Sequence, residues 1–521
     1  MQRKKILLVS YENDYVPIAQ LAKRFLDDNN DVLICISDFF GPTTDDFAKR
    51  AYLAEGFEES QITDFKIELN AASENAIDPV DYEYLTAIEK KIKINIHQLI
   101  FSDYHLSTLY HNRRTTFTPK DKERILKITE TILKKCERLL YDFKPDLIFS
   151  FGNNHIVKAI IYHLNKLRAT PFLALDNNRI NNTFSILENF WIGPSKLITY
   201  DQQQLVTSSA TCKEALVFID KIREEAQPAY DNEKTFSTTS PYIYSWTTQI
   251  IHIFRKFLML PGYLYVKYLK NIKSLGQRQK YFTEKGFFQI LSREYIIKFI
   301  ITRAFLANKK FNITTLPNKK YIYFPMHLIP ENGIFAQPNF TSEFDLIKRL
   351  ARIIPVDYII AVKPNPRQIL LTGDPYPNYL YRELSELHNV EIMSVTVSSM
   401  TLMRNAVAVV SLAGTSLLEA AISGKPAFAY ADPEFLSLDG VHKFNESTFS
   451  DLLKDANQSV NHSNQKYYIQ AIINNSLPLD FVKYGGVSFP MSKTIEYQIN
   501  FIKPIYRSIL KAYEKYCLVV K

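Results

Sequence analysis

The stretch Val407–Asp439 decides the fold, and it begins Val-Ala-Val-Val-Ser-Leu-Ala-Gly-Thr-Ser-Leu-Leu-Glu-Ala-Ala-Ile-Ser-Gly-Lys-Pro-Ala-Phe-Ala-Tyr-Ala-Asp-Pro. The opening run Val407–Ala413 is mostly apolar and rich in Val, which is typical of a buried parallel strand. Gly414 ends that run, and the pattern predicts a helix from Thr415 to about Gly424 and another strand over Ala427–Tyr430. This order predicts a compact βαβ unit.

The loop between the predicted strand and helix is a candidate anion site. Backbone N–H groups and a helix N-terminus meet at Gly414–Ser416, where a phosphate or carboxylate would be held. Gly414 allows close approach of the ligand, and the hydroxyls of Thr415 and Ser416 add donors. A structural alternative exists, because Ser416 and Glu419 have the spacing of a capping box. Glu419 is otherwise a candidate acceptor for ribose hydroxyls.

Length and composition indicate a globular protein of two or three domains. The chain has 521 residues, of which 46% are hydrophobic and 22% charged. Its net charge of +9 is modest for this length and does not by itself imply nucleic acid. The four cysteines form no Cys-x-x-Cys pair, which suits a reducing compartment and argues against zinc or a disulfide framework.

No signal peptide or transmembrane run is predicted, so a cytoplasmic location is expected. The segment Thr235–Thr283 has no Asp or Glu and interleaves basic with aromatic and aliphatic residues. One interpretation is peripheral contact with an anionic membrane on the cytoplasmic face of the inner membrane. The other, equally weighted, is an interdomain helical pair packed on its own protein. Nucleic acid is a poorer third interpretation, because no recognition motif accompanies the charge.

The N-terminal part reads as a doubly wound α/β domain without Gly-x-Gly-x-x-Gly, so no dinucleotide cofactor is expected. Strands are predicted over Lys5–Ser10, Val32–Ile36, Asp146–Phe151 and Thr170–Leu175, with mainly helical structure from about 44 to 140. Polar residues at strand ends should share one rim. Of these, Glu12, Asp14 and Asp176 are candidate bases or nucleophiles, and His155 and Arg179 are candidates for orienting substrate. Taken singly, each is also explained as structural or solvated.

A second α/β unit is predicted from strands at Tyr321–Phe324, Asp357–Val362 and Asn389–Met393. His327 follows the first of these strands, and it is a candidate for phosphate binding or proton transfer, or else a surface or capping histidine. Lys363-Pro-Asn-Pro-Arg367 follows the second strand. Its prolines stiffen the loop, and Lys363 and Arg367 match a diphosphate or monophosphate, unless the loop is an ordinary solvated turn.

These patterns predict two Rossmann-like α/β domains facing each other across a cleft, with helical insertions. The expected units are residues 1–215, a basic aromatic connection at 216–315, a C-terminal domain at 316–490, and a bracing helix at 491–521. No Gly-x-Ser-x-Gly, Asp-x-Asp, His-Glu-x-x-His or Walker motif occurs, so neither a hydrolytic triad nor a bound metal is expected.

The C-terminal half resembles the capsule polysaccharide biosynthesis family, which includes bacterial Kdo transferases with a GT-B-type fold. The resemblance covers roughly Tyr321–Tyr430, and a weaker match covers Pro171–Phe184, including Arg179-Ile180. The matching pieces, in the family's order, are Tyr321–His327, Leu346–Leu350, Val362–Pro366, Leu402–Val410, Gly414–Ala420 and Gly424–Pro426.

The resemblance implies a glycosyltransferase that uses a nucleotide sugar, with a CMP-linked donor expected and no other cofactor. The donor would lie on the C-terminal domain and a glycan or lipid-linked acceptor on the N-terminal one. Asn365 stands where the family's Lys-x-His-Pro-like loop has His, so it can donate a hydrogen bond but carries no charge. The alternatives are a sugar-nucleotide epimerase or hydrolase of the same fold, and a non-catalytic capsule-assembly subunit.

The predicted site residues fall into three groups. The donor-binding group is Lys363, Asn365, Arg367, Gly414, Thr415, Ser416 and Glu419. The catalytic candidates are Asp14, Asp176 and His327, and the acceptor-binding candidates are Glu12, His155 and Arg179.

Overall fold

A computed structural model describes most of the chain outside the basic connecting region. The described residues are 3–11, 14–37, 47–65, 79–103, 106, 119–152, 155–188, 193–225, 229, 305, 308–328, 342–366, 368, 378–456, 464–479 and 494–520. Glu12, Arg367 and the segment Thr235–Thr283 lie outside these ranges, so their predicted roles stay predictions.

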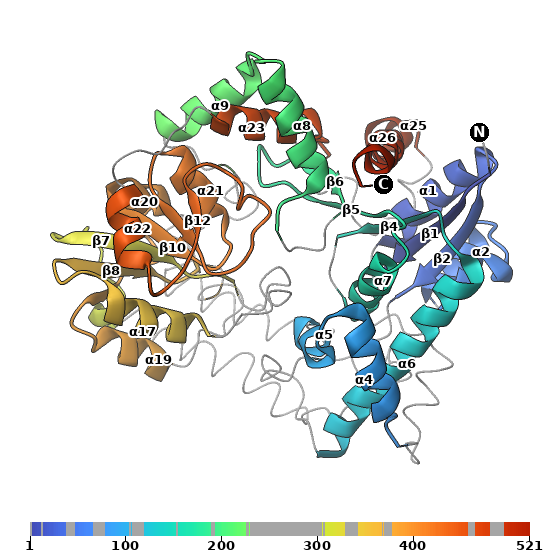
Figure 1. The fold of residues 1–521 in the computed structure, drawn as a ribbon, viewed down its shortest axis with the longest axis horizontal. Helices are drawn as coiled ribbons and strands as arrows, with labels where there is room; N and C mark the ends of the chain where they lie inside the picture. Colours follow the sequence, from blue (N-terminus) through green and yellow to red (C-terminus); the bar gives the residue numbers. More distant parts are fainter. Residues whose placement is uncertain are drawn as a thin grey trace, which may run out of the picture.

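The N-terminal half is built on a six-stranded sheet in the order β3-β2-β1-β4-β5-β6 (Figure 1). The strands are β1 (Lys5–Ser10), β2 (Asp31–Ile36), β3 (Ile62–Thr63), β4 (Leu147–Phe151), β5 (Phe172–Asn177) and β6 (Phe184–Leu187). All neighbours are parallel except β5 and β6, which form an antiparallel hairpin. The doubly wound α/β architecture predicted for this half is confirmed, whereas β3 and β6 were not predicted, and β3 lies in the stretch predicted to be mainly helical.

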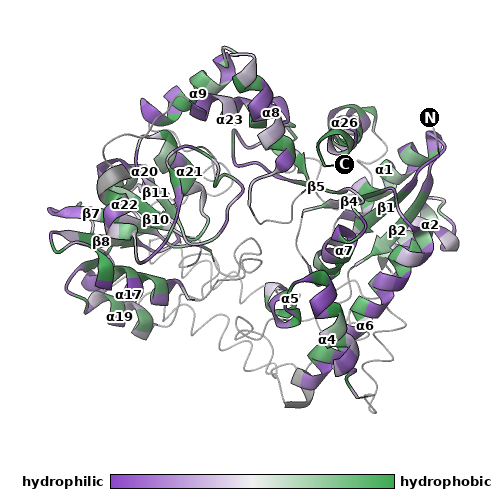
Figure 2. Cartoon of the chain, in the orientation of Figure 1, coloured by the Kyte–Doolittle hydropathy of each residue, from purple (hydrophilic) through white to green (hydrophobic). Residues whose placement is uncertain are grey.

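Helices cover both faces of this sheet, as the alternation of β1 shows. Leu7 and Val9 belong to one hydrophobic cluster, and Ile6 and Leu8 belong to another on the opposite face. The helices of this half are α1 (Tyr15–Asp27), α2 (Phe47–Ala54), α4 (Tyr82–Ile92), α5 (Ile96–Ser102), α6 (Pro119–Phe143) and α7 (Ile156–Lys166). Hydrophobic and hydrophilic residues alternate along α6 (Figure 2), as expected of a helix with one face on the core.

The C-terminal end of the chain returns to the N-terminal half. It forms α25 (Ile495–Tyr497), a π-helical turn at Gln498–Ile502 and α26 (Lys503–Val519). Phe501, Ile505 and Ile509 are fully buried in the same cluster as Ile6 and Leu8 of β1. This helix therefore supplies part of the core over one face of the first sheet.

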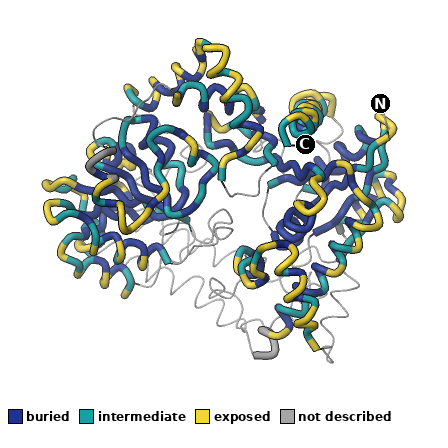
Figure 3. Tube along the Cα trace, viewed as in Figure 1, coloured by how far each residue is buried: buried dark blue, intermediate teal, exposed yellow. Residues whose placement is uncertain are grey.

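The C-terminal half contains a second six-stranded sheet in the order β12-β11-β10-β7-β8-β9. Its strands are β7 (Lys320–Pro325), β8 (Tyr358–Lys363), β9 (Val390–Ile392), β10 (Ala408–Ser411), β11 (Ala427–Ala429) and β12 (Val441–Lys443). Its helices are α17 (Glu343–Ile353), α19 (Asn378–Ser385), α20 (Ser399–Asn405), α21 (Thr415–Ile422) and α22 (Phe449–Ala456). All strand pairs are parallel, and Figure 3 shows the central strands of both sheets as mostly buried. The protein therefore has two Rossmann-like α/β halves.

Three helices join the halves: α8 (Lys196–Thr207), α9 (Lys213–Arg223) and α23 (Gln465–Asn474), which lie together in Figure 1. Ile198 of α8 and Phe218 of α9 share a hydrophobic cluster with Leu417 and Ile469. Leu197 of α8 belongs to the N-terminal core and Ile198 to this cluster, so α8 contributes to both cores, and the predicted domain boundary at residue 215 stays a prediction. The sequence pattern shows that these helices have an apolar face but not which domain covers it.

The chain crosses between the halves at two adjacent places. Phe184, at the start of β6, exchanges backbone hydrogen bonds with Leu477, with N···O distances of 3.0 and 2.7 Å. The Asn178 side chain also donates to the Ser476 hydroxyl at 2.7 Å. The outgoing and returning segments are thus pinned to each other beside the β5–β6 hairpin. Within the described residues, no helix has the length and apolar character needed to span a bilayer.

Candidate functional site

Both sheets reverse their winding direction between two central strands. These strands are β1 and β4 in the first sheet and β7 and β10 in the second. In such sheets, ligands bind outside the carboxyl ends of the strands at this switch point. In the C-terminal half, His327 follows β7 and Gly414 follows β10, so the topology brings two predicted site residues to one place.

The carboxylate of Glu343 fixes the orientation of His327 through two groups of the histidine, its backbone N–H and its ring Nδ1. The carboxylate accepts the backbone N–H of His327 at 3.0 and 3.2 Å, and one of its oxygens lies 2.9 Å from Nδ1. The Glu343 side chain is fully buried and that of His327 is 9% exposed. Because an ionised carboxylate only accepts hydrogen bonds, Nδ1–H donates to Glu343, and Nε2 can donate to an anion only when the ring is doubly protonated. The other ring nitrogen, Nε2, is buried and has no hydrogen-bond partner in the described part of the chain.

The Nε2 atom of His327 faces the predicted anion loop. A Cβ atom placed on Gly414 would lie 3.0 Å from Nε2 and 3.2 Å from the Ser416 hydroxyl. Gly414 is the N-cap of α21 and no side chain caps the helix. Gly414, Thr415 and Ser416 are all half-buried rather than enclosed. A ring nitrogen, a hydroxyl and an uncapped helix N-terminus therefore converge on one small space, as a phosphate oxygen requires.

The capping-box alternative is wrong. Ser416 lies within the first turn of α21 rather than at its N-cap. Glu419 instead accepts a hydrogen bond from the Ala229 backbone N–H at 2.9 Å. Burial raises the pKa of Glu419 to about 7, and the Ala229 N–H partly offsets that rise. This contact gives Glu419 a structural role at the start of the connecting region, and its contact with a ribose stays a prediction.

Lys363 lies beside His327 because β7 and β8 are paired. Lys363 is the residue opposite Pro325, and its carbonyl accepts the Met326 N–H at 2.9 Å. Its side chain reaches the Ser399 hydroxyl at 2.7 Å, at the start of α20. Asn365 is half-buried two residues further on. The second basic loop therefore begins on the same edge of the sheet as the Gly414–Ser416 loop.

Arg179 extends from the N-terminal half to this loop. It lies in the turn between β5 and β6, and its Nε is 2.7 Å from a carboxylate oxygen of Glu434. Its Nη1 donates to the Thr415 hydroxyl at 3.2 Å. We predicted an acceptor-binding role for Arg179, and the structure places its guanidinium at the predicted donor loop.

Asp176 lies on the same hairpin as Arg179, near the end of β5. Burial raises its pKa to about 6, the Asn177 N–H lowers it, and the charge of Glu434 raises it further. The charges of Arg179 and Lys158 act in the opposite direction. A half-buried carboxylate with a pKa near neutrality has the properties of a general base.

Asp14 and His155 lie at the switch point of the N-terminal sheet, where other residues engage them. The Asp14 carboxylate is 3.6 Å from Nζ of Lys158, which is fully buried and donates to the Phe151 carbonyl at 2.5 Å. The Nε2 atom of His155 is 3.9 Å from the buried carboxylate of Asp103. Their predicted roles in catalysis and acceptor binding stay predictions.

Several important partners were missed by sequence reasoning. They are Glu343, Glu434, Ser399, Lys158 and Asp103. Nothing in the sequence spacing links any of these residues to its partner. The one available signal was the placement of Glu343 in the first turn of a helix following the His327 loop.

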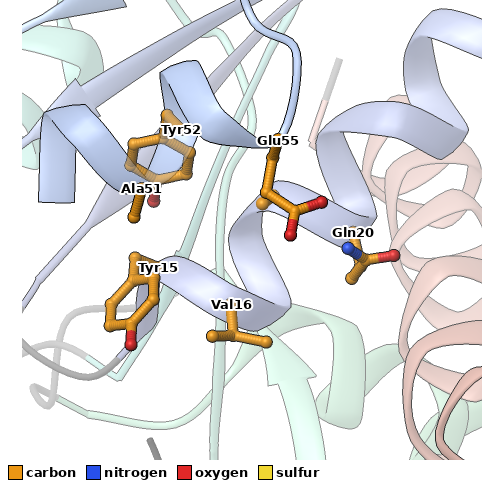
Figure 4. Close-up of a pocket in the computed structure, with 7 residues that line it drawn as sticks. Tyr15, Val16, Gln20, Ala51, Tyr52 and Glu55 are labelled. Atoms are coloured by element: carbon orange, nitrogen blue, oxygen red, sulfur yellow. The ribbon is translucent and has the colours of Figure 1, made fainter. Parts of the chain in front are cut away.

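A separate pocket lies between α1 and α2 of the N-terminal half (Figure 4). It is a shallow depression lined by Tyr15, Val16, Ala19, Gln20, Ala51, Tyr52 and Glu55. Glu55 pairs with Lys23 at 2.5 Å, and the other lining residues carry no charge at neutral pH. This pocket therefore lacks the cations of the Gly414 loop. No cluster of three or more potential metal-ligating side chains occurs in the ranges that the structure describes.

No known protein-family model and no curated protein sequence matches the chain. Among solved structures, a β-Kdo 2,7 transferase, KpsC of Thermosulfurimonas dismutans, is 13% identical, with TM-score 0.31 over 68% of this chain and 84% of that one. The β-Kdo 2,4 transferase of the same KpsC is 9% identical, with TM-score 0.33 over 62% and 78%. A UDP-GlcNAc 2-epimerase from Neisseria meningitidis, bound to UDP-GlcNAc, is 13% identical, with TM-score 0.25 over 98% and 100%. Kdo transferases, which the sequence resemblance named, are thus among the similar structures.

The raised pKa of Glu419 predicts a pH dependence of stability. An unfolded glutamate titrates at about 4.3, so between about pH 4.3 and 7 the folded chain keeps a proton that the unfolded chain releases. Stability should therefore fall as pH rises through this interval. Glu419→Gln should make the decline shallower in urea unfolding at pH 5, 6, 7 and 8. Glu386→Gln, an exposed exchange just after α19, controls for a general effect of removing a carboxylate. An unchanged slope in Glu419→Gln would contradict the prediction.

Gly414→Ala should weaken anion binding without unfolding the protein. The φ angle of Gly414 is −69°, which alanine adopts freely, but the new methyl group would fill the space beside His327 and Ser416. We expect nucleotide affinity to fall about tenfold or more, since charge-assisted hydrogen bonds are displaced. Gly56→Ala provides the contrast, because Gly56 has φ +93° and open space around it. That variant should lose stability and keep its affinity.

Proposed function

We propose that the protein is a glycosyltransferase that moves a sugar from a nucleotide-activated donor to a surface glycan of the capsular or lipopolysaccharide type. The observation that carries the proposal is the buried Nε2 of His327, which faces Gly414 and the Ser416 hydroxyl at an uncapped helix N-terminus. Lys363 on the neighbouring strand and Arg179 from the other half add two cations to the surroundings of this loop. The phosphates of a nucleotide sugar are anions that cations, hydroxyl groups and a helix N-terminus of this kind can bind.

The donor side would stabilise the leaving group. As the bond from sugar to phosphate breaks, negative charge increases on the departing phosphate oxygen, and fixed donors stabilise that charge most when they are already oriented. The Glu343 contacts hold His327 in this way, and the bond to Ser399 holds Lys363. With these groups in place, the proposed mechanism needs no metal ion. A CMP-linked donor stays the prediction from the family resemblance.

Asp176 is the carboxylate best placed to act on the acceptor. It shares a hairpin with Arg179, whose side chain touches the donor loop, and Asp14 is paired with the buried Lys158. The acceptor hydroxyl would give its proton to Asp176 while its oxygen forms the new bond to the anomeric carbon. The electron pair of the breaking bond would leave with the nucleotide phosphate.

Nucleotide binding tests the donor site. Isothermal titration with CMP, UDP and GDP should find at least one that binds at or below millimolar levels. Lys363→Ala and Ser416→Ala should each weaken that binding by about three- to thirtyfold, since each removes a hydrogen bond to a charged group. Lys320→Ala is the matched control. Lys320 is exposed and begins β7, so it lies at the amino ends of the strands, away from the carboxyl ends where the candidate site lies. Absence of binding by all three nucleotides would refute the proposed function.

Turnover tests the chemistry. Transfer of radiolabelled sugar should require glycan acceptor, whereas consumption of the donor alone would indicate an epimerase or hydrolase instead. Asp176→Asn should lower kcat by about a hundredfold or more while keeping nucleotide affinity. Because a base acts only when ionised, wild-type kcat should fall as pH drops through about 6. Asp357→Asn, exposed on the other half, should behave as wild type. A fully active Asp176→Asn enzyme would move the base elsewhere.

A further inference from the structure

Arg179 occupies an electrostatically unusual position. Its guanidinium contacts Thr415, the first residue of α21, and thus lies at the positive end of a helix. A cation is disfavoured at a helix N-terminus, where backbone N–H groups point outward. Glu434 lies 2.7 Å from Nε and offsets this repulsion. The arrangement gathers more positive charge at the loop than the half-buried carboxylate of Glu434 neutralises, which favours binding of a further anion.

The backbone of Arg179 is held in a conformation that few residues adopt. Its φ is +62°, in the left-handed region that carries a cost for a residue with a side chain. The Asn177 side chain accepts the Arg179 N–H at 2.6 Å, and the Asn178 side chain accepts the Ile180 N–H at 3.0 Å. Ile180 is fully buried in the core shared with α21. The turn therefore directs the Arg179 side chain at the loop rather than leaving it in solvent.

The chemistry of the guanidinium suits a phosphate. It is planar, permanently charged, and presents several N–H donors in a fixed fork that matches two oxygens of a phosphate group. Its contacts with Glu434 and Thr415 hold the fork against the N-terminus of α21. Thr415 is also one residue from Ser416, whose hydroxyl borders the space beside Nε2 of His327.

We propose that Arg179 is the residue through which the N-terminal half binds the charged phosphate of the donor, and that Glu434 positions its guanidinium before the donor arrives. This inference rests on the proposed function, because it presumes a nucleotide at the Gly414 loop. It assigns Arg179 to the donor rather than to the acceptor. It also makes donor binding a direct link between the two halves, since the phosphate would be held by groups from both.

Paired ligands test this assignment. Arg179→Gln should weaken binding of the best nucleotide among CMP, UDP and GDP by about ten- to a hundredfold. Binding of the matching nucleoside, which lacks phosphate, should not change. The nucleotide affinity of Arg179→Gln should also depend less on salt than that of the wild type, because one ionic contact is gone. Arg382→Gln is the matched control, since Arg382 is exposed on α19 and pairs only with its helix neighbour Glu386 at 3.3 Å among the contacts described.

Two further variants keep the test decisive if Arg179→Gln is unstable. Arg179→Lys keeps the charge and loses the fork, so its nucleotide affinity should lie between those of the wild type and Arg179→Gln. Glu434→Gln keeps an acceptor for Nε and removes a negative charge near the phosphate, so nucleotide should bind about two- to fivefold more tightly.

The possible failures are distinguishable. If the wild type binds no nucleotide, the proposed function fails. If the wild type binds but Arg179→Gln and Arg179→Lys bind equally well, only the role of Arg179 is overturned. Equal losses for nucleotide and nucleoside would show that Arg179 is a structural clip between the halves. If a folded Glu434→Ala, which removes the acceptor for Nε, binds nucleotide no more weakly than Glu434→Gln does, the positioning role given to Glu434 is overturned.

Discussion

The parallel pairing of β7 with β10 is the constraint on which the candidate site depends. Ile322 and Tyr323 of β7 lie opposite Ala408 and Val409 of β10, at the centre of the second sheet. All four side chains are fully buried, so the register is fixed by the core on both faces. Because the strands run in the same direction, both carboxyl ends open at one edge. His327 and Gly414 meet there without any loop having to reach far.

A second constraint joins the N-terminal half to that edge. The β5–β6 hairpin carries Asp176 in its first strand and Arg179 in its turn, and Phe184 in its second strand bonds to the returning chain at Leu477. Arg179 then contacts both Glu434 and Thr415. A candidate base and a candidate phosphate-binding cation are thereby held three residues apart on one rigid element. Their spacing depends on local backbone geometry more than on the relative orientation of the two sheets.

The sequence was sufficient to locate most of the strands and the Gly414–Ser416 loop, though not β3, β6 or β12, and the reason is local. Apolar runs broken by glycine and proline mark buried parallel strands and the loops that follow them, so Gly414–Ser416 and Lys363 could be placed on one edge. The partners of the site residues could not be predicted, because they depend on packing between distant segments. Glu343 pairs with His327 and Glu434 with Arg179 through tertiary contacts, and the Ala229 N–H that Glu419 accepts lies far away in the chain. The capping box failed because a spacing does not fix the residue at which a helix begins.

The same contacts that hold Arg179 also influence the proton affinity of Asp176. Burial is the largest cause of the raised pKa of Asp176, the charge of Glu434 raises it further, and the charge of Arg179 lowers it. The two members of the ion pair therefore have opposite effects on the pKa of Asp176. Any ligand that draws the guanidinium away from Asp176, or adds negative charge beside it, must raise the pKa of that carboxylate. An anion bound at the Gly414 loop, as proposed, would therefore favour proton uptake at Asp176.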